Sequence, residues 1–486
     1  MFALTLSVCA ISLTTHRQLG YLRGMADRWL GLGLNLRVNG VLGDGQEPTV
    51  FKPPGYPAFI ALVVLARGEA PERIGAYTSY PAWSELHGLP LPYDPATVVR
   101  VVSAVYWAQA IALSAAAALL FLWLCRVARE PVAFVGALLF GLSPHTLILV
   151  GFLHYSVLHL LLMIAGALAL EHALASAPPA RRLWFVAGIV WGLATLVRPV
   201  TLLLPPFVLA VLLVRPRTRP WRTSLGAALV FTLGMGAVLA PYTARNYARS
   251  GTLIPVSAQV WMNLWAASLS DVPPQPDHIR WKAVREPLMR ILKRVPESPL
   301  RTDPETVRDS LRLEAEFRRL TIRNLDRKPG VYAANVAASL WTLVRDVPTV
   351  LVKNFQYMGR PEATVRDWYS LGRKQDFHPP GASRASAWMV HVLGLFSLGA
   401  LIVDLRRRDP ALLVTAALWL CIVVAHALVW MDLLYYYVKL PFVFVAGFRF
   451  VDLALAWLGR RAGGAWETLA HVLLLALGIG LAAWVL

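Results

Sequence analysis

Residues 101–125 read VVSAVYWAQAIALSAAAALLFLWLC, an apolar run without a charged side chain, lying between Arg100 and Arg126. A helix needs about 20 consecutive apolar residues to cross a bilayer, so this run predicts a transmembrane helix. Ten further apolar runs, several of them shorter, are bounded by charge or proline: Phe2–Leu13, Val132–Val150, Phe152–Leu170, Leu183–Val197, Val200–Val214, Leu225–Pro241, Ala387–Val403, Ala411–Trp430, Val438–Leu458 and Leu469–Leu486. We therefore predict an all-α, polytopic transmembrane helical bundle of about 11 spans.

The composition agrees with an integral membrane protein. The chain has 486 residues and is 57% hydrophobic but only 15% charged, whereas soluble domains carry about 25% charged residues. Its net charge of +19 is distributed between the apolar runs and is not gathered in one polar domain. This distribution indicates topology signals and an anionic lipid partner, and it argues against nucleic acid. All three cysteines, Cys9, Cys125 and Cys421, lie in apolar runs and are interpreted as small buried hydrophobes.

The arginines between the runs predict an orientation. If Met1 is cytoplasmic, strict alternation of the spans places every arginine-rich short loop on the cytoplasmic side. These loops carry Arg126/Arg129, Arg181/Arg182, Arg215/Arg217/Arg219/Arg222, Arg406/Arg407/Arg408 and Arg460/Arg461. The short loops assigned to the outer side, around residues 143–145, 198–199 and 430–437, carry almost no cations. This contrast is the pattern that the positive-inside rule requires.

Two long segments are too polar to span and fall on the outer face, Thr14–Arg100 and Tyr242–Ser386. The first contains Gly24–Gly40, which is apolar at helical spacing and predicts a helix lying in the membrane interface. The second contains Ile279–Asp326, where cations alternate with aliphatic residues; a solvated amphipathic helix pair and a surface facing lipid head groups both fit this pattern. The chain divides accordingly into an N-terminal membrane module (1–241, with its first outer loop at 14–100), an outer loop region (242–386) and C-terminal membrane helices (387–486).

Four cations from distant parts of the chain are predicted to meet on the outer face: Lys52, Arg198, Arg245 and Lys439. Lys52 belongs to the stretch EPTVFKPPGYP (residues 47–57), whose prolines restrict the backbone. The other three lie at the outer ends of apolar runs. Arginine forks and lysine charges suit a phosphate or pyrophosphate at head-group level. The alternative for each single cation is orientation in the interface by snorkelling.

Candidate acid–base and metal residues are fewer. Asp27 opens the first amphipathic segment, where a carboxylate could act as general base; the alternative is a helix N-terminal acid stabilised by the helix dipole. His145, His154 and His159 lie near one another in the chain, but their spacing is not a convincing ligand set, so we interpret them as core or pore-lining residues. The sequence contains no P-loop, no HExxH and no GxSxG motif.

Several of these motifs, in this order, resemble the GT-C membrane glycosyltransferases, in particular the bacterial branch related to protein O-mannosyltransferases and the lipid A aminoarabinose transferase. They are DRWLGLGLNL (residues 27–36), KPPGYP (52–57), GLATLVRP (192–199) and PYTARNY (241–247). The resemblance covers nearly the whole chain.

The resemblance implies transfer of a sugar from a polyprenyl-phosphate donor to a lipid, glycan or protein acceptor on the extracytoplasmic face of the inner (plasma) membrane, with inversion. Asp27 would deprotonate the acceptor. The substrate-binding residues would be Lys52, Tyr56, Arg198, Arg245, Asn246 and Lys439. No cofactor is identified, and a divalent metal stays open. The alternative hypotheses are a polyprenyl-linked glycan ligase and a transporter or flippase for polyprenyl-linked sugars; the absence of half-to-half similarity in the sequence favours the transferase.

Overall fold

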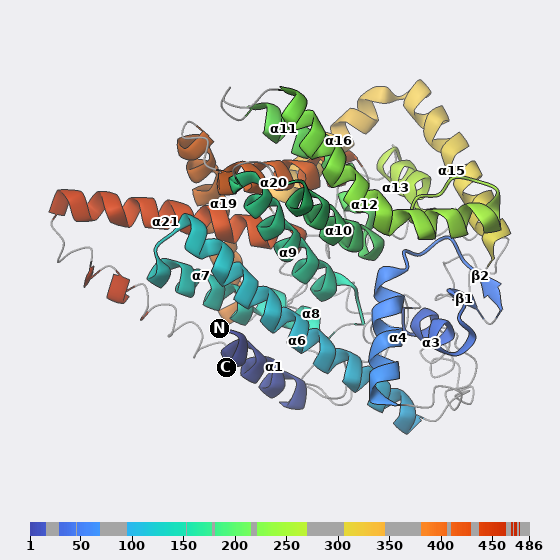
Figure 1. The fold of residues 1–486 in the computed structure, drawn as a ribbon, viewed down its shortest axis with the longest axis horizontal. Coiled ribbons are helices and arrows are strands. Elements are labelled where there is room, and N and C mark those ends of the chain that lie inside the picture. The colour runs from blue at the N-terminus through green and yellow to red at the C-terminus, as the bar shows by residue number, and fades with distance from the viewer. Residues whose placement is uncertain are drawn as a thin grey trace.

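The computed structural model is built almost entirely of helices (Figure 1). It describes residues 1–15, 29–44, 46–68, 95–151, 153–176, 180–214, 221–269, 306–345, 381–405, 410–428 and 437–462, and a few positions between 468 and 476. One short antiparallel pair of strands, β1 (Gly43–Asp44) and β2 (Glu47–Pro48), is the exception to the helical pattern in these ranges. The predicted all-α class is therefore confirmed at this level.

The elements of the N-terminal half are α1 (Phe2–Thr15), α3 (Trp29–Asn39), α4 (Gly55–Arg67), α6 (Pro95–Val127), α7 (Glu130–Leu142), α8 (Pro144–Val150), α9 (Ser156–Ala175), α10 (Arg181–Val197), the 3-10 helix η2 (Pro199–Leu203) and α11 (Leu204–Val214). The later elements are α12 (Trp221–Ser250), α13 (Val260–Ala267), α15 (Val307–Arg327), α16 (Pro329–Arg345), α19 (Gly381–Leu405), α20 (Pro410–Leu428) and α21 (Leu440–Ala462). Within the described ranges, four stretches are long and apolar enough to cross a membrane, and they lie in α6, α9, α12 and at α21.

One prediction differs from the structure. The predicted run Val132–Val150 is divided into α7 and α8 at Ser143-Pro144, because proline has no N–H to continue the helical hydrogen-bond pattern. The first outer segment contains an apolar helix, α4, whose 13 residues are fewer than the about 20 needed for a full span. The predicted run Leu469–Leu486 lies mostly outside the described residues.

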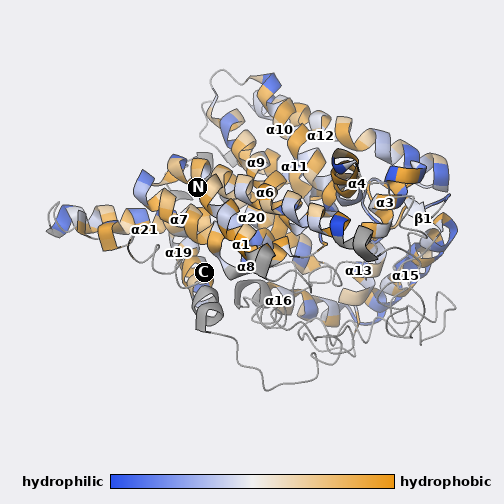
Figure 2. Ribbon diagram, turned by 90° about the horizontal axis from the view of Figure 1, so that it is seen from below, coloured by the Kyte–Doolittle hydropathy of each residue, from blue (hydrophilic) through white to orange (hydrophobic). Residues whose placement is uncertain are grey.

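The amphipathic segments are described in part. Helix α3 lies within the predicted segment Gly24–Gly40, and its buried residues include Trp29 and Asn35. Helix α15 covers the end of Ile279–Asp326; it buries Leu313 and Phe317 and is otherwise rich in arginine. Figure 2 shows the contrast between the largely hydrophobic bundle helices and the more hydrophilic α15.

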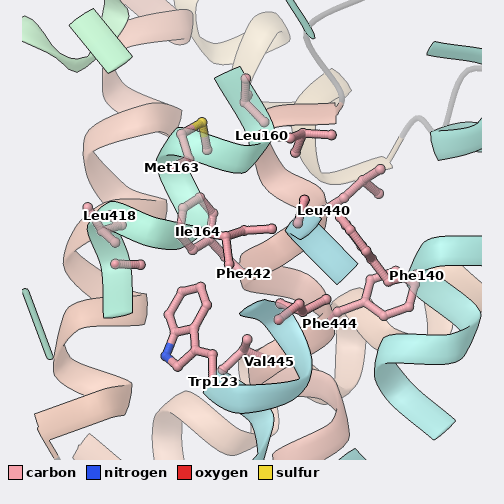
Figure 3. Packing of buried hydrophobic residues seen from close by; sticks show 14 of the residues in the cluster. Trp123, Phe140, Leu160, Met163, Ile164, Leu418, Leu440, Phe442, Phe444 and Val445 are labelled. Carbon is pink, nitrogen blue, oxygen red and sulfur yellow. The ribbon is translucent and has the colours of Figure 1, made fainter. Parts of the chain in front are cut away.

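The main core lies between α6, α7, α9 and α21. Trp123 of α6 meets Phe442 of α21 edge to face, with ring centroids 6.0 Å apart, and Phe140 of α7 meets Phe444 of α21 in the same way at 5.5 Å. Figure 3 shows these rings surrounded by aliphatic side chains. Burial of these large apolar side chains stabilises the packing of α21 against α6 and α7.

Glycines let two pairs of elements approach at backbone distance. A Cβ on Gly188 of α10 would lie 2.1 Å from the carbonyl oxygen of Phe231 in α12, and one on Gly234 would lie 2.2 Å from that of Phe185. Small residues at such crossings allow the close packing that holds membrane helices together. At Gly55, the first residue of α4, a Cβ would lie 2.7 Å from the backbone nitrogen of Val197. The start of α4 therefore sits directly on the end of α10.

Candidate functional site

The loop that carries Lys52 is fixed from two sides. Gly55, at the end of this loop, packs against the backbone of α10 at Val197, one residue before Arg198. From α12, Arg245 donates through Nη1 to the carbonyl of Thr49 at 2.7 Å and through Nη2 to that of Leu42 at 3.2 Å. The hydroxyl of Tyr242 donates to the carbonyl of Lys52 at 3.3 Å. These hydrogen bonds hold the backbone of the loop, and the loop in turn fixes the position of the Lys52 side chain.

Arg198 stands at the end of α10, in extended backbone conformation, and only 7% of its surface is exposed. Its Nη1 donates to the Tyr437 hydroxyl at 3.1 Å, and its Nη2 lies 2.9 Å from Nε2 of His426. A guanidinium can only donate, so Nε2 of His426 is the acceptor, and Nδ1 of that ring carries the proton and donates to the carbonyl of Ile422. The guanidinium also lies 5.6 Å from the ring centroid of Tyr155 and 5.7 Å from that of Tyr437.

Two aromatic rings connect Lys52 to Arg198. Nζ of Lys52 lies 5.0 Å from the ring centroid of Trp29. Trp29 meets Tyr155 edge to face at 5.5 Å, and Tyr155 lies under the Arg198 guanidinium. Cation–π contacts of this kind stabilise a charge that has lost part of its water. We call Trp29, Lys52, Tyr155, Arg198 and Tyr437 the cation cluster.

His154 lies beside the cation cluster. It lies in the short connection before α9, its ring is 3.9 Å from that of Tyr155, and its Nδ1 is hydrogen-bonded to Oγ of Ser156. Burial, then the charge of Arg198, then that of Lys52 lower the pKa of His154 to about 3. Both cations therefore act on the His154 ring.

The structure brings some of the predicted site residues together and separates others. Lys52 and Arg198 are connected through the rings of Trp29 and Tyr155. Arg245 donates to the backbone of the Lys52 loop, whereas the buried Asn246 accepts from Arg245 and donates to the carbonyl of Ile254, in the segment after α12. Asp27, the predicted base, lies outside the described residues.

Two further predicted residues are enclosed. Tyr56 is fully buried, and its hydroxyl donates to Oε1 of Gln109 at 2.8 Å. Lys439 is 5% exposed. Lys439 and His391 of α19 both act electrostatically on His145, so these three residues form a second basic group. The Tyr437–Lys439 turn before α21 joins the two groups, since Tyr437 belongs to the cation cluster.

Sequence reasoning missed the residues that surround Arg198, namely Tyr155, Tyr437 and His426. Tyr437 ends the run YYY (residues 435–437) next to Lys439, and His426 is a polar residue within an apolar run, so each gave a weak signal. The histidines 145, 154 and 159 are buried, as a core interpretation requires. In the part of the chain that the structure describes, no group of three or more His, Cys, Asp or Glu side chains could hold a metal ion.

No protein-family model and no curated protein matches the sequence. Solved structures with a similar helical arrangement include the archaeal oligosaccharyltransferase AglB from Archaeoglobus fulgidus in complex with an inhibitory peptide and a dolichol-phosphate, at 12% identity and a TM-score of 0.49, over 99% of this chain and 55% of that one. They also include ArnT from Cupriavidus metallidurans bound to undecaprenyl phosphate, at 15% identity and a TM-score of 0.34, over 92% of this chain and 76% of that one.

The chain thus spans about half the length of the archaeal enzyme. At these identities and TM-scores the likeness does not assign an activity to this chain.

Proposed function

We propose that this chain is a GT-C type membrane glycosyltransferase, which moves a sugar from a polyprenyl-phosphate donor to an acceptor on the extracytoplasmic face. The observation that supports the proposal is the chain of ring contacts between Lys52 and Arg198, which come from distant parts of the sequence: Lys52 lies by the ring of Trp29, Trp29 meets Tyr155, and Tyr155 lies by the Arg198 guanidinium. Two cations in a largely buried, aromatic environment suit a group with two or more negative oxygens. A lipid phosphate is such a group. Because its hydrocarbon chain lies in the bilayer, the protein that binds it is a membrane protein.

The reaction needs a leaving group that can accept negative charge. When the acceptor oxygen attacks the anomeric carbon, the bond between that carbon and the phosphate oxygen breaks, and its electron pair stays on the phosphate. Lys52 and Arg198 would stabilise this charge, and such stabilisation is strongest where water is excluded. Asp27 is the proposed base that takes the acceptor's proton. A single displacement, with attack opposite the leaving phosphate, inverts the configuration at the anomeric carbon. Arg245 serves as a positioning residue, because it holds the loop of Lys52, and Asn246 accepts a hydrogen bond from Arg245.

The proposed topology is the one that the arginine pattern predicts, with about 11 spans and the cation cluster on the outer face of the inner (plasma) membrane. Lys52, Arg198 and Lys439 lie at ends of described helices that this topology assigns to the same side. Arg126 and Arg129 lie at the opposite ends of α6 and α7. The division into a membrane module (1–241), an outer region (242–386) and C-terminal helices (387–486) belongs to the same proposal.

Two measurements test the function. Mass spectrometry of envelope glycolipids and glycoproteins, with and without the gene, should show one glycan species that disappears. Native mass spectrometry of the protein in nanodiscs should show binding of undecaprenyl phosphate, which Lys52→Met and Arg198→Gln weaken and Arg222→Gln, in the predicted cytoplasmic loop, does not.

A glycan profile unchanged by the gene would contradict the transferase. In vesicles, Asp27→Asn should abolish sugar transfer. If the wild-type protein moves a polyprenyl-linked sugar across the bilayer without forming a new glycosidic bond, the protein is a transporter.

A further inference from the structure

Phe51, the residue before Lys52, connects the Lys52 loop to the outer region (242–386). Its side chain is 2% exposed, and the ring is buried among apolar residues of two helices of that region. These residues are Met262, Trp265 and Ala266 of α13 and Leu313 and Phe317 of α15. The rings of Trp265 and Phe317 are themselves in contact, with centroids 4.8 Å apart. The two helices therefore enclose a side chain that the loop supplies.

The backbone of the loop is bound to the same region. The carbonyl of Val50 accepts a hydrogen bond from the backbone N–H of Ala258 at 2.9 Å. The Val50 side chain is fully buried and packs with Ile254 and Ala258. Next to it, the backbone N–H of Phe51 donates to Oγ1 of Thr49 at 3.1 Å. The outer region thus holds both the main chain and the side chains of the residues just before Lys52.

Phe51 also lies beside the Lys52 charge. Nζ of Lys52 is 6.0 Å from the ring centroid of Phe51 and 5.0 Å from that of Trp29, so Phe51 and the cation cluster meet at this ammonium group. Consecutive residues share a rigid peptide unit, and a displacement of Phe51 therefore moves the backbone of Lys52. The packing of α13 and α15 around Phe51 fixes one end of this connection, and Lys52 is the other end.

We propose that Phe51 is a positioning residue, through which α13 and α15 hold Lys52 where it binds the lipid phosphate. This inference rests on the proposed function, because that function assigns the phosphate to Lys52. The coupling is reciprocal: if the packing of Phe51 raises the affinity for the phosphate, binding of the phosphate stabilises this packing by the same factor. The outer region and the phosphate site are then energetically coupled, although α13 and α15 contribute no cation to the cluster.

The first test measures the affinity for undecaprenyl phosphate in nanodiscs. Phe51→Leu leaves the Lys52 charge in the chain but loosens its support, so we expect an affinity about tenfold lower, at the low end of the loss for one charge-assisted hydrogen bond. Phe317→Leu changes only the α15 side of the contact, should act in the same direction, and serves if Phe51→Leu does not fold. Phe140→Leu, at a fully buried phenylalanine of α7, is the matched control and should leave the affinity unchanged. An unchanged affinity in both outer variants would overturn the inference.

A double-mutant cycle separates positioning from a general loss of structure. Phe51→Leu is introduced into the Lys52→Met variant, and the affinity of the pair is compared with that of each single variant. If Phe51 acts through Lys52, the second substitution lowers the affinity no further. Equal losses from Phe51→Leu in the presence and in the absence of Lys52 would show that Phe51 supports the fold alone.

A third measurement uses the wild-type chain and follows the reciprocal effect by hydrogen exchange. The Ala258 amide, bonded to the Val50 carbonyl, reports opening of the contact between the outer region and the loop. We expect undecaprenyl phosphate to slow its exchange by up to about tenfold and undecaprenol to leave it unchanged. Binding of the phosphate without this change would overturn the inference and leave the proposed function standing. Failure of the wild type to bind the phosphate would contradict the proposed function itself.

Discussion

The arginines at the two ends of the helical bundle have different described partners. At one end, Nε of Arg129 lies 2.6 Å from Oδ1 of Asp452, and Arg449 lies 3.8 Å from the other carboxylate oxygen. At the other end, the described partners of Arg198 are a hydroxyl, an imidazole nitrogen and two ring faces. Arg129 and Arg449 thus meet a carboxylate, whereas the described partners of Arg198 are neutral groups. The first arrangement joins α7 to α21, and the second surrounds the cation at which we propose that a phosphate binds.

The largest expected effect is at Arg198. Arg198→Gln removes the charge but keeps a donor for Tyr437 or His426, so the affinity for undecaprenyl phosphate should fall about 100-fold, which corresponds to one or two charge-assisted hydrogen bonds. Binding is measured in nanodiscs at fixed ionic strength. Arg129→Gln is the counterpart at the other end and should leave the affinity unchanged. Equal losses in the two variants would end the distinction between the ends.

Gly55 tests how the cation cluster is assembled. Gly55→Ala places a Cβ against the backbone of Val197, so α4 must shift and carry Lys52 away from Arg198. We expect a loss of about 1–3 kcal/mol in stability and a measurable loss of lipid-phosphate binding. Gly226→Ala in α12 is the matched control, because its new methyl group meets no atom within 4 Å. Thermal unfolding and binding that match this control would show that the close approach at Gly55 is not needed.

Asp452 tests the other end. Asp452→Asn leaves Arg129 and Arg449 without their carboxylate, and we expect a loss of about 1–3 kcal/mol; a fully buried pair costs more, but the Arg129 side chain is 37% exposed and partly screened. Thermal unfolding in detergent gives the stability, and undecaprenyl phosphate binding should be unaffected. If instead binding falls while stability stays, the carboxylate acts on the ligand site and the comparison is wrong.

The smallest effect concerns a carboxylate that meets backbone N–H groups. Oε1 of Glu314 in α15 accepts from the backbone N–H of Trp261, while Oε2 is buried without a partner in the described chain. Burial raises the pKa of Glu314 to about 7, against the lowering effect of backbone N–H groups at the start of α13. The folded state therefore holds the proton more tightly than the unfolded state, and stability should fall as the pH rises from about 4.5 to 7.

Glu314→Gln should remove this pH dependence and raise the unfolding temperature at pH 8 by a few degrees relative to the wild type. Glu316→Gln is the control, since Glu316 is on the same helix and its pKa is lowered by Arg319. A difference between wild type and Glu314→Gln that is the same at pH 5 and pH 8 would show that the carboxylate does not titrate in this range.

Much of the fold could be predicted, but less of the site. The apolar runs predicted most of the membrane helices, and the departure occurred at Pro144, where a proline divides an apolar run into α7 and α8. For the site, sequence order suggested that Lys52 and Arg198 meet, but it gave Arg245 and Asn246 the same role, whereas the described donors of Arg245 are directed at the Lys52 loop and at Asn246, and that of Asn246 at the segment after α12. Tyr437 and His426 gave only weak signals, and Tyr155 gave none that distinguished it from a core residue.

The sequence by itself predicted an all-α membrane protein, because hydrophobic runs and the charges between them are local features of consecutive residues. Only the tertiary structure decided which cations share one space. That choice depends on contacts between residues far apart in the chain, such as Gly55 on Val197 and Gly188 on Phe231, whose backbone distances set where each helix ends relative to its neighbours. Small shifts there would separate Lys52 from Arg198 without changing any helix, because the field between two charges depends on their distance.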